Sequence, residues 1–468
     1  MVTTTSVLER IDEEDFQAVD FRFTDLAGRW QHIGFAAAKV DQRVLEEGVM
    51  FDGSAVPGWR DASESDMMLV PVLETAVADP FSAQPTLIMI ADVTEPGSGL
   101  GYDRCPRTIA GRAATHLAAT GLADRATVAS EIAFSVFDDV RHDVSAGEAF
   151  WRVDSEEGRA SSGRRFDVGN GGHRFSEAAP YAVPPADHLA DLRAEIVNML
   201  QTMGLEAQHQ QHNPSPCQGE INLAPRAMLD MADGVQIYRY VVQNVANSYG
   251  KTATFMPKPL AFEPGAGFEI QQSLWQGDKP VFAGRGYADL SDNCLHFIGG
   301  ILQHAQALNA FTNPTTNSYR RLAPGQMAPR HLAYAALNRS AAVRLPFAAR
   351  PEDKRVELRF PDPSANAYLA FAALLMAGLD GIARQVDPGE PMDRNLYDLP
   401  MSEIEEMPTV CRTLDQALAA LDRDRAFLTQ GEVFSDGVID AYIALKKNEI
   451  AALEAVPHPV EYQLYYSV

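Results

Sequence analysis

The sequence has little cysteine and no long apolar run. Only four cysteines occur in 468 residues, at Cys105, Cys217, Cys294 and Cys411, and no two of them form a CxxC pair. Such sparse usage predicts a reducing compartment rather than a disulfide framework. No apolar stretch approaches the length of a membrane span, and the acidic N-terminus lacks a signal-peptide core. We therefore expect a cytoplasmic protein without a membrane partner.

Basic residues are also scarce relative to acidic ones. The chain has 39 Lys and Arg against 63 Asp and Glu, which gives a formal net charge of -24. Binding of nucleic acid needs clustered Lys and Arg against the phosphates, so nucleic acid is not an expected partner. The apolar share of 46% and the charged share of 22% are ordinary for a soluble globular protein, and solubility alone explains the acidity.

A segment rich in Gly and Pro, residues 95–107, is typical of a domain boundary. The chain before it reads as short strands joined by turns, clearest at 86–93. The chain after it mixes strands with helices. Apolar residues at helical spacing and terminal glycines predict helices over about 186–203, 234–249 and 291–310. We therefore predict an N-terminal domain over residues 1–103 and a larger domain over residues 104–468.

Four segments alternate polar and apolar residues as strands do, and each has a glutamate on its polar face. The segments are 130–137, 217–223, 267–274 and 354–360, with Glu131, Glu220, Glu269 and Glu357. A sheet with one face in water would explain any one of them. If the four polar faces instead converge in a cavity, metal cations or arginines must neutralise the carboxylates. Ligands that are all oxygen atoms would favour Mg²⁺ or Mn²⁺ over zinc.

Long stretches of the chain carry a family resemblance, in the same order as in the family. They include FDGSAVPGW (51–59), NGGHRF (170–175), NPTTNSYRRLAPG (313–325), ELRFPDPSANAYLAFAALLMAGLDGI (357–382) and PHPVEYQLYYSV (457–468). With these segments the chain resembles the bacterial type I glutamine synthetases over nearly its whole length. The resemblance implies an α+β fold, in which a small β-grasp-like N-terminal domain precedes a large α/β catalytic domain with a curved antiparallel sheet.

The resemblance also implies an assembly. In that family the active site lies between subunits, and two stacked hexameric rings form a dodecamer. The loop with Asp52 and Ser54 contributes to the site of the neighbouring subunit, and the C-terminal segment 457–468 joins the rings. Tyr397 lies where some relatives are adenylylated, although an unmodified loop tyrosine fits the sequence equally well.

Glutamine synthetases phosphorylate the side-chain carboxylate of glutamate with ATP, and ammonia then displaces the phosphate. Phosphoryl transfer needs divalent cations and basic side chains to spread the developing charge. The resemblance therefore implies ATP and Mg²⁺ or Mn²⁺ as cofactors, and a small-molecule carboxylate and amine as substrates.

The family's metal at the glutamate side of the site has lost ligands in this chain. One ligand position holds Ala133, the next falls at Gln211 or His212, and Glu220 remains. This leaves Glu220 and, in one alignment, His212 as metal ligands.

The family's metal at the nucleotide side keeps more of its ligands. Glu131 and Glu357 are retained, and Glu269 replaces the ligand histidine. Three carboxylates could still hold a hard cation. A metal-free site neutralised by arginines, or a new metal site made by His212, Glu220 and Glu269, also fits the sequence.

Substrate-side positions are changed as well. Met327 replaces the flap glutamate that helps to deprotonate ammonium, and methionine has no proton to exchange. Pro264 replaces an asparagine that contacts the amino acid, and Gln271 replaces a histidine associated with ATP. Other positions match the family: Asp52, Arg339 and Arg359 as catalytic residues, Gly265, Arg321 and Arg344 for substrate, and Ser273 and Arg355 for nucleotide. Arginine suits such sites because its planar fork binds carboxylate or phosphate at two points.

These substitutions predict an ATP-dependent carboxylate–amine ligase of altered specificity rather than an ordinary glutamine synthetase. Relatives in the family join glutamate to other amines, such as methylamine or polyamines, and a neutral amine needs the missing base less. A catalytically inactive homologue that acts by binding a ligand or partner is one alternative. An enzyme with a changed reaction in the same cavity is another.

Overall fold

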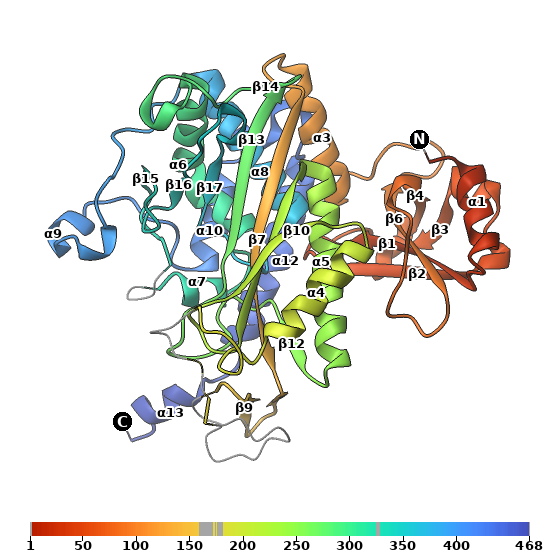
Figure 1. The fold of residues 1–468 in the computed structure, drawn as a ribbon, viewed down its shortest axis with the longest axis horizontal. Coiled ribbons are helices and arrows are strands. Elements are labelled where there is room, and N and C mark those ends of the chain that lie inside the picture. Colours follow the sequence, from red (N-terminus) through yellow and green to blue (C-terminus); the bar gives the residue numbers. More distant parts are fainter. Residues whose placement is uncertain (1, 159–171, 174, 176–180, 324–327, 468) are drawn as a thin grey trace.

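The computed structural model describes residues 2–158, 172–173, 175, 181–323 and 328–467 (Figure 1). A six-stranded sheet forms near the N-terminus, with strand order β2-β1-β6-β4-β3 and β5 paired to β6. Its elements are α1 (Thr4–Glu13), β1 (Ala18–Thr24), β2 (Trp30–Ala36), α2 (Gln42–Glu47), β3 (Val49–Asp52), β4 (Asp66–Pro71), β5 (Val77–Ala78) and β6 (Thr86–Thr94). Strands β1 and β6 are parallel and central, and both read as nearly continuous buried runs because both of their faces are covered.

The main sheet has nine strands in the order β10-β11-β7-β13-β17-β16-β15, with β12 paired to β7 and β14 to β13. Among the described strands of this sheet, only β15 and β16 pair in parallel. The strands are β7 (Arg125–Phe137), β10 (Ala207–His212), β11 (Gln218–Ala227), β12 (Thr252–Thr254), β13 (Phe268–Gln276), β14 (Lys279–Pro280), β15 (Tyr334–Ala336), β16 (Val343–Leu345) and β17 (Val356–Leu358). A separate hairpin joins β8 (Asp139–Val144) to β9 (Ala149–Asp154).

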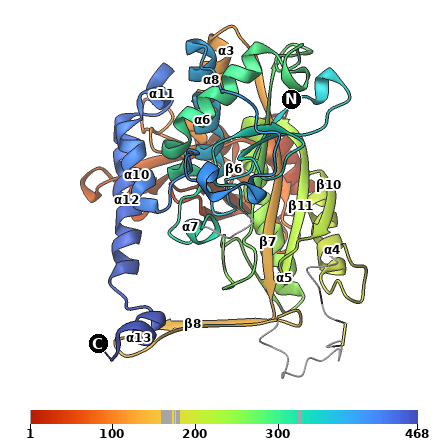
Figure 2. The ribbon, with the colours of Figure 1, turned by 90° about the vertical axis from the view of Figure 1, so that its left-hand side faces the viewer.

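The helices of the larger domain include α3 (Pro106–Ala119), α4 (Ala190–Thr202), α5 (Met228–Ser248), α6 (Asp292–Thr312), α7 (Ser318–Arg321), α8 (Ala367–Arg384), α9 (Met401–Ile404), α10 (Leu414–Arg423), α11 (Ala426–Thr429), α12 (Asp436–Glu454) and α13 (Pro459–Tyr465). Chiefly α3, α5, α6 and α8 cover the apolar face of this sheet, whereas α9 and α13 lie apart from it (Figures 1 and 2). Apolar side chains of β7 and β13, among them Ile132, Phe134 and Phe268, are fully buried against these helices. The opposite face of the same strands is therefore left to polar side chains, as the alternation in the sequence predicts.

Helix α8 is the centre of the helical layer. It is the one helix of the described residues that is long and apolar enough to cross a membrane, but 83% of that window is buried inside the protein. It packs against α3, α5 and α6. Gly300 of α6 and Gly381 of α8 allow the closest approach, since a Cβ at Gly300 would lie 2.1 Å from the carbonyl oxygen of Ala377. Helix α8 is thus a core helix.

The two sheets are joined by a buried ionic network. Arg107 of α3 donates from Nε and Nη2 to the two carboxylate oxygens of Asp233 at 3.0 Å each, and from Nη1 to Asp92 of β6 at 2.5 Å. The hydroxyl of Tyr368 donates to Asp233 at 2.6 Å. Because Asp92 belongs to the N-terminal sheet and the others to the main helices, this network fixes the relative position of the two parts.

We expect Arg107→Met to lower the free energy of unfolding by about 3–5 kcal/mol, because it leaves the buried Asp233 carboxylate without its cation. Urea denaturation followed by tryptophan fluorescence measures the change. Arg43→Met is the matched control, since the Arg43 side chain is 80% exposed in its ion pair with Glu47, and it should cost less than about 0.5 kcal/mol. Equal effects of the two substitutions would contradict the assigned role of Arg107.

Candidate functional site

Four glutamates gather on the polar face of the main sheet. Their strands are neighbours in the order β11, β7, β13 and β17. Glu131 lies opposite Glu269 between β7 and β13, and Glu220 lies opposite Ala133 between β11 and β7. Glu357 lies opposite Gln271 between β17 and β13. The polar faces identified in the sequence therefore adjoin one another instead of facing water separately.

Two arginines neutralise part of this charge. Arg359 donates from Nη2 and Nε to Glu269 Oε1 at 2.7 and 3.0 Å. Arg344 donates from Nη1 to Glu357 Oε2 at 2.8 Å. The side chains of Glu269 and Arg359 are each 12% exposed, so this pair is poorly screened by water.

The pKa values of the glutamates show that negative charge remains in excess. Burial, a hydrogen bond that the protonated Glu131 donates to Glu220, and the charges of Glu220 and Glu269 raise the pKa of Glu131 to about 9. Burial and the charge of Glu269 raise the pKa of Glu357 to about 7, against the effect of the arginines. Burial opposes ionisation of Glu269 too, but Arg359 holds its pKa below the usual value. A bound cation would therefore favour the loss of a proton from this cluster.

The nucleotide side of the cluster fits a hard divalent cation. Glu131, Glu269 and Glu357 supply three carboxylates and no nitrogen or sulfur, which is the ligand chemistry of Mg²⁺ or Mn²⁺. One oxygen of Glu357, Oε1, is buried without a hydrogen bond among the described residues. This oxygen lies 3.4 Å from Arg359 Nε as an ion pair. A buried acceptor without a hydrogen bond and raised pKa values are both what a bound cation would relieve.

The other side of the cluster is satisfied by amides. Gln211 donates from Nε2 to Glu220 Oε1 at 2.7 Å, and Asn213 donates from Nδ2 to Glu220 Oε2 at 3.0 Å. Asn222 donates from Nδ2 to Glu131 Oε2 at 2.8 Å. Ala133 is fully buried opposite Glu220 and offers no ligand atom. Neutral amide donors therefore contact the glutamates at the place where the family resemblance implies a second metal.

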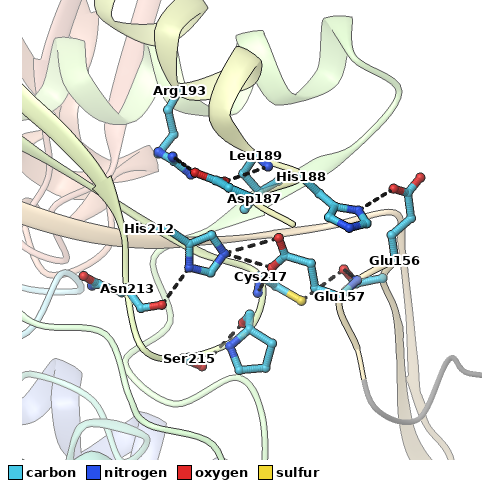
Figure 3. Close-up of polar contacts among 12 residues, drawn as sticks. Glu156, Glu157, Asp187, His188, Leu189, Arg193, His212, Asn213, Ser215 and Cys217 are labelled. Atoms are coloured by element: carbon cyan, nitrogen blue, oxygen red, sulfur yellow. Dashed lines mark hydrogen bonds and ion pairs between the residues drawn. The ribbon is translucent and has the colours of Figure 1, made fainter. Parts of the chain in front are cut away.

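His212 does not lie with Glu220 on the polar face. A bulge between Ala207 and His209 sets the register of β10 so that Gln211 lies opposite Glu220. His212 instead approaches Glu157, with Nε2 3.0 Å from Glu157 Oε2, and donates from Nδ1 to the carbonyl of Asn213 at 2.7 Å (Figure 3). A new metal site made of His212, Glu220 and Glu269 therefore has no geometric support.

His212 is part of a buried group that sequence reasoning missed. Ligand atoms of Glu157, Asp187 and His212 lie within 4.8 Å of one another. Asp187 is already held by Arg193, whose Nη2 is 2.5 Å from Asp187 Oδ2 (Figure 3). Both acids of this group thus already have a partner, His212 for Glu157 and Arg193 for Asp187. Glu157 lies in a polar, Gly-rich segment without periodicity, so no sequence signal marked it.

Two of the predicted substrate residues have structural contacts. Arg321 is buried, and its guanidinium donates to the carbonyl oxygens of Phe360 and Arg359 at 2.8 and 3.0 Å. These bonds hold the segment that carries Arg359. A Cβ at Gly265 would lie 2.6 Å from the carbonyl oxygen of Pro257 and 2.9 Å from Arg321 Cγ, so only glycine fits there.

The predicted nucleotide residues lie further along the polar face. Arg355 donates from Nε to Gln271 Oε1 at 2.7 Å. Ser273 Oγ lies 2.7 Å from Thr127 Oγ1, next to the indole of Trp275, whose Nε1 donates to Ser273 Oγ at 3.2 Å. These positions extend the polar face from the carboxylates toward the β14 end of β13.

The remaining predicted residues are placed as follows. Asp52 ends β3 of the N-terminal sheet, where it is exposed and accepts hydrogen bonds from the backbone and hydroxyl of Ser54 at 2.9 and 2.6 Å. These bonds lower the pKa of Asp52. Asp52 therefore belongs to a different sheet from the glutamates of its own chain (Figure 1). The charge of Arg339 acts on Glu269. Met327 lies outside the described residues.

The chain matches the family models "Glutamine synthetase, beta-Grasp domain" over residues 15–96 and "Glutamine synthetase, catalytic domain" over residues 103–465. The chain belongs to the glutamine synthetase family. It is 49% identical to the glutamine synthetase of Bradyrhizobium diazoefficiens, and the match covers 100% of both chains.

Two further proteins are similar to this chain over nearly their whole length. The 3-hydroxylaminophenol mutase of Cupriavidus pinatubonensis is 47% identical, over 100% of this chain and 99% of the mutase. The solved glutamine synthetase of Plasmodium falciparum superposes with a TM-score of 0.90 at 27% identity, over 100% of this chain and 99% of that one. The predicted fold class, a β-grasp domain followed by a catalytic domain with a curved sheet, is confirmed.

We expect Glu131→Gln to stabilise the protein at high pH but not at low pH. Below the unfolded-state pKa of about 4.5, Glu131 is protonated in both states, so the substitution should change stability little there. As the pH rises, the unfolded chain loses this proton first while the folded chain retains it toward pH 9, so the wild type loses stability over that interval. The variant should therefore gain at least about 1 kcal/mol at pH 8 over its value at pH 5.

Urea denaturation at the two pH values, in metal-free buffer, measures this difference. Glu148→Gln, in the exposed turn between β8 and β9, is the control and should show no such difference. A gain of the same size at both pH values, or a loss at pH 8, would show that Glu131 is not crowded by other carboxylates.

Proposed function

We propose that the protein is a glutamine synthetase-like, ATP-dependent ligase that joins a carboxylic acid to an amine, with a specificity different from ordinary glutamine synthesis. The observation that carries the proposal is the asymmetry of the carboxylate cluster. Its nucleotide side keeps three carboxylates and an excess of negative charge, whereas amide donors hold Glu220 on the side where glutamate and ammonia would react.

The nucleotide side supports binding of ATP with one Mg²⁺ or Mn²⁺. Glu131, Glu269 and Glu357 would hold the cation, which when bound neutralises charge on the phosphates. Arg339 and Arg355 form no ion pair with a carboxylate of the described residues, although Arg355 donates to Gln271 Oε1 and to the carbonyl of Asp353. Their charge would therefore suit an anionic ligand. Arg344 is shared with Glu357 and would be released to a substrate anion when a cation takes over its role.

The side of the cluster near Glu220, where the amine would react, supports a nucleophile other than ammonia. Ammonium must lose a proton before it attacks, and the family's base for that step aligns with Met327. Ala133 further removes a carboxylate from the same side. A larger amine with a lower pKa, which arrives partly neutral, depends less on either group. Arg321 and Arg359 would hold the carboxylic acid from the opposite side, with Gly265 leaving room for it.

The same proposal includes a homo-oligomer, which we take to be a dodecamer in the cytoplasm. Asp52 is exposed on the N-terminal sheet, as a residue that completes a neighbour's site must be. Helix α13 lies beside the β8–β9 hairpin, apart from the helical layer, with Trp151 and His458 in ring contact at 5.6 Å (Figure 2). Val460, Tyr462 and Leu464 of this helix are exposed, which fits an interface between subunits.

The proposal also includes a cytoplasmic location and a domain boundary between residues 103 and 104, and each has its own support. All four cysteines are buried and free, which fits a reducing cytoplasm. A division at residues 103 and 104 fits the position of the Gly- and Pro-rich segment between β6 and α3.

A changed reaction in the same cavity is the second candidate. It is favoured by the 3-hydroxylaminophenol mutase, which is about as similar to this chain as the glutamine synthetases are. A mutase reaction would not need the nucleotide, whereas the ligase reaction does. The two candidates are therefore separated by their requirement for ATP.

Phosphate release from ATP, screened over a panel of carboxylic acids and amines with Mg²⁺, tests the proposal. We expect at least one pair that contains an alkylamine or aromatic amine to release phosphate about tenfold faster than glutamate with ammonium. Glu357→Gln should lower the rate of that best pair about 100-fold, because it removes a carboxylate from the cation site.

Three results would contradict the proposal in different ways. Fastest release with glutamate and ammonium would show an ordinary glutamine synthetase. Conversion of a hydroxylaminoaromatic substrate without ATP would establish the mutase-type reaction. Binding of nucleotide or acid without turnover for any pair would establish a catalytically inactive homologue.

A further inference from the structure

The buried group of Glu157, Asp187 and His212 lies on three separate segments of the chain (Figure 3). Glu157 follows β9, Asp187 precedes α4, and His212 ends β10. Their side chains are 2%, 7% and 1% exposed, and their ligand atoms lie within 4.8 Å of one another. None of the four glutamates belongs to this group, so it is distinct from the carboxylate cluster.

The hydrogen bonds of His212 determine which ring nitrogen carries a proton. Nδ1 lies 2.7 Å from the main-chain carbonyl oxygen of Asn213, and a carbonyl oxygen only accepts. Nδ1 is therefore protonated, and in the neutral imidazole the lone pair is on Nε2. Histidines that bind metals have this arrangement, because the nitrogen that does not bind the metal usually donates to a carbonyl or carboxylate.

Nε2 of His212 faces acceptor atoms. It lies 3.0 Å from Oε2 and 3.2 Å from Oε1 of Glu157, and an ionised carboxylate only accepts. A buried lone pair that faces both oxygens of a buried carboxylate needs a positive centre between them. That centre is either a proton on Nε2 or a metal ion.

Asp187 is held in place by donors outside the group. Arg193 donates to Oδ1 at 3.1 Å and to Oδ2 at 2.5 Å, and the amide of Leu189 donates to Oδ1 at 3.2 Å. A carboxylate accepts at about four lone-pair sites, so one site of Asp187 remains for a metal. Because Arg193 balances the charge of Asp187, the charge of Glu157 is balanced only by the positive centre at His212.

One imidazole nitrogen and two carboxylate oxygens suit zinc. Zinc binds both kinds of atom at about 2.0–2.2 Å, so the ligand atoms of a tetrahedral site lie about 3.3 Å apart or slightly more. The two separations between Nε2 and the Glu157 oxygens are close to this value. Mn²⁺ binds sites with nitrogen ligands more weakly than the other divalent ions of its series, so the Mn²⁺ that fills the glutamate cluster is not expected here.

We propose that Glu157, Asp187 and His212 bind one Zn²⁺ ion per chain. The ion joins the three segments that carry these residues. It thereby fixes the end of β10, where Gln211 and Asn213 donate to Glu220. The zinc is a structural ion next to the carboxylate cluster, and its binding requires neither ATP nor a substrate.

Zinc analysis of the full-length protein tests this site. After incubation with excess Zn²⁺ and gel filtration, mass spectrometry of the metal content should find one zinc per chain, retained in Glu357→Gln. Competition with a chromophoric chelator measures the affinity. Glu157→Gln and His212→Gln should each weaken zinc binding at least about tenfold, the loss that even a substitution outside the ligand set produces. Glu156→Gln, which removes the same charge one residue away, should leave the affinity nearly unchanged.

X-ray absorption at the zinc edge of the unsubstituted protein decides the question if these variants fail to fold. We expect nitrogen and oxygen ligands that include one imidazole, and no sulfur, because the Cys217 thiol donates to Ser155 Oγ at 3.0 Å instead. A sulfur ligand at about 2.3 Å would overturn the proposal.

Three other results would also overturn it. Absence of tightly bound zinc would show that a proton on Nε2 alone balances Glu157. Equal zinc affinity in Glu157→Gln and Glu156→Gln would exclude Glu157 as a ligand. Loss of zinc in Glu357→Gln would place the ion among the four glutamates. Loss of phosphate release in Glu357→Gln, with zinc retained, keeps this test independent of the proposed function.

Discussion

The repulsion between carboxylates on one face of the main sheet is the constraint on which the site depends. Strand pairing brings Glu220, Glu131, Glu269 and Glu357 together on four neighbouring strands. The apolar face of the same strands is packed on the central helices, so the strands cannot turn these side chains away. Arg344, Arg359 and the amides of Gln211, Asn213 and Asn222 all donate hydrogen bonds to these carboxylates. The protein must neutralise their negative charge with arginine, with a proton or with a metal cation.

The two ends of the cluster meet this constraint differently. At the Glu220 end, Ala133 removes one carboxylate and the amides of Gln211 and Asn213 satisfy another, so little charge remains for a cation to neutralise. At the Glu357 end, Glu269 replaces a neutral histidine of the family with a further negative charge. That charge pairs with Arg359, which donates to Glu269 at 2.7 Å. We therefore propose that the cluster binds one cation, where the family resemblance implies two.

Much of this arrangement could be predicted from the sequence. Alternation placed Glu131, Glu220, Glu269 and Glu357 on the polar faces of strands, and the family resemblance implied a curved antiparallel sheet. Other features depend on geometry that alternation does not contain. The bulge in β10 decides that Gln211 and not His212 lies beside Glu220. The partner of His212, Glu157, comes from a segment with no periodic pattern.

The sequence left open whether arginines neutralise the glutamates. It also did not decide which of Arg344, Arg355 and Arg359 would do so. The structure pairs Arg344 and Arg359 with glutamates and Arg355 with Gln271.

The number of Mn²⁺ ions bound per chain tests the account most directly. Titration of the metal-free protein with Mn²⁺ in the presence of ADP, followed by electron paramagnetic resonance, counts tightly bound ions. The account predicts one tight site per chain, lost in Glu357→Gln and kept in Glu220→Gln. Two tight sites would contradict the loss of the glutamate-side metal. No tight site would show that arginines and protons alone neutralise the cluster.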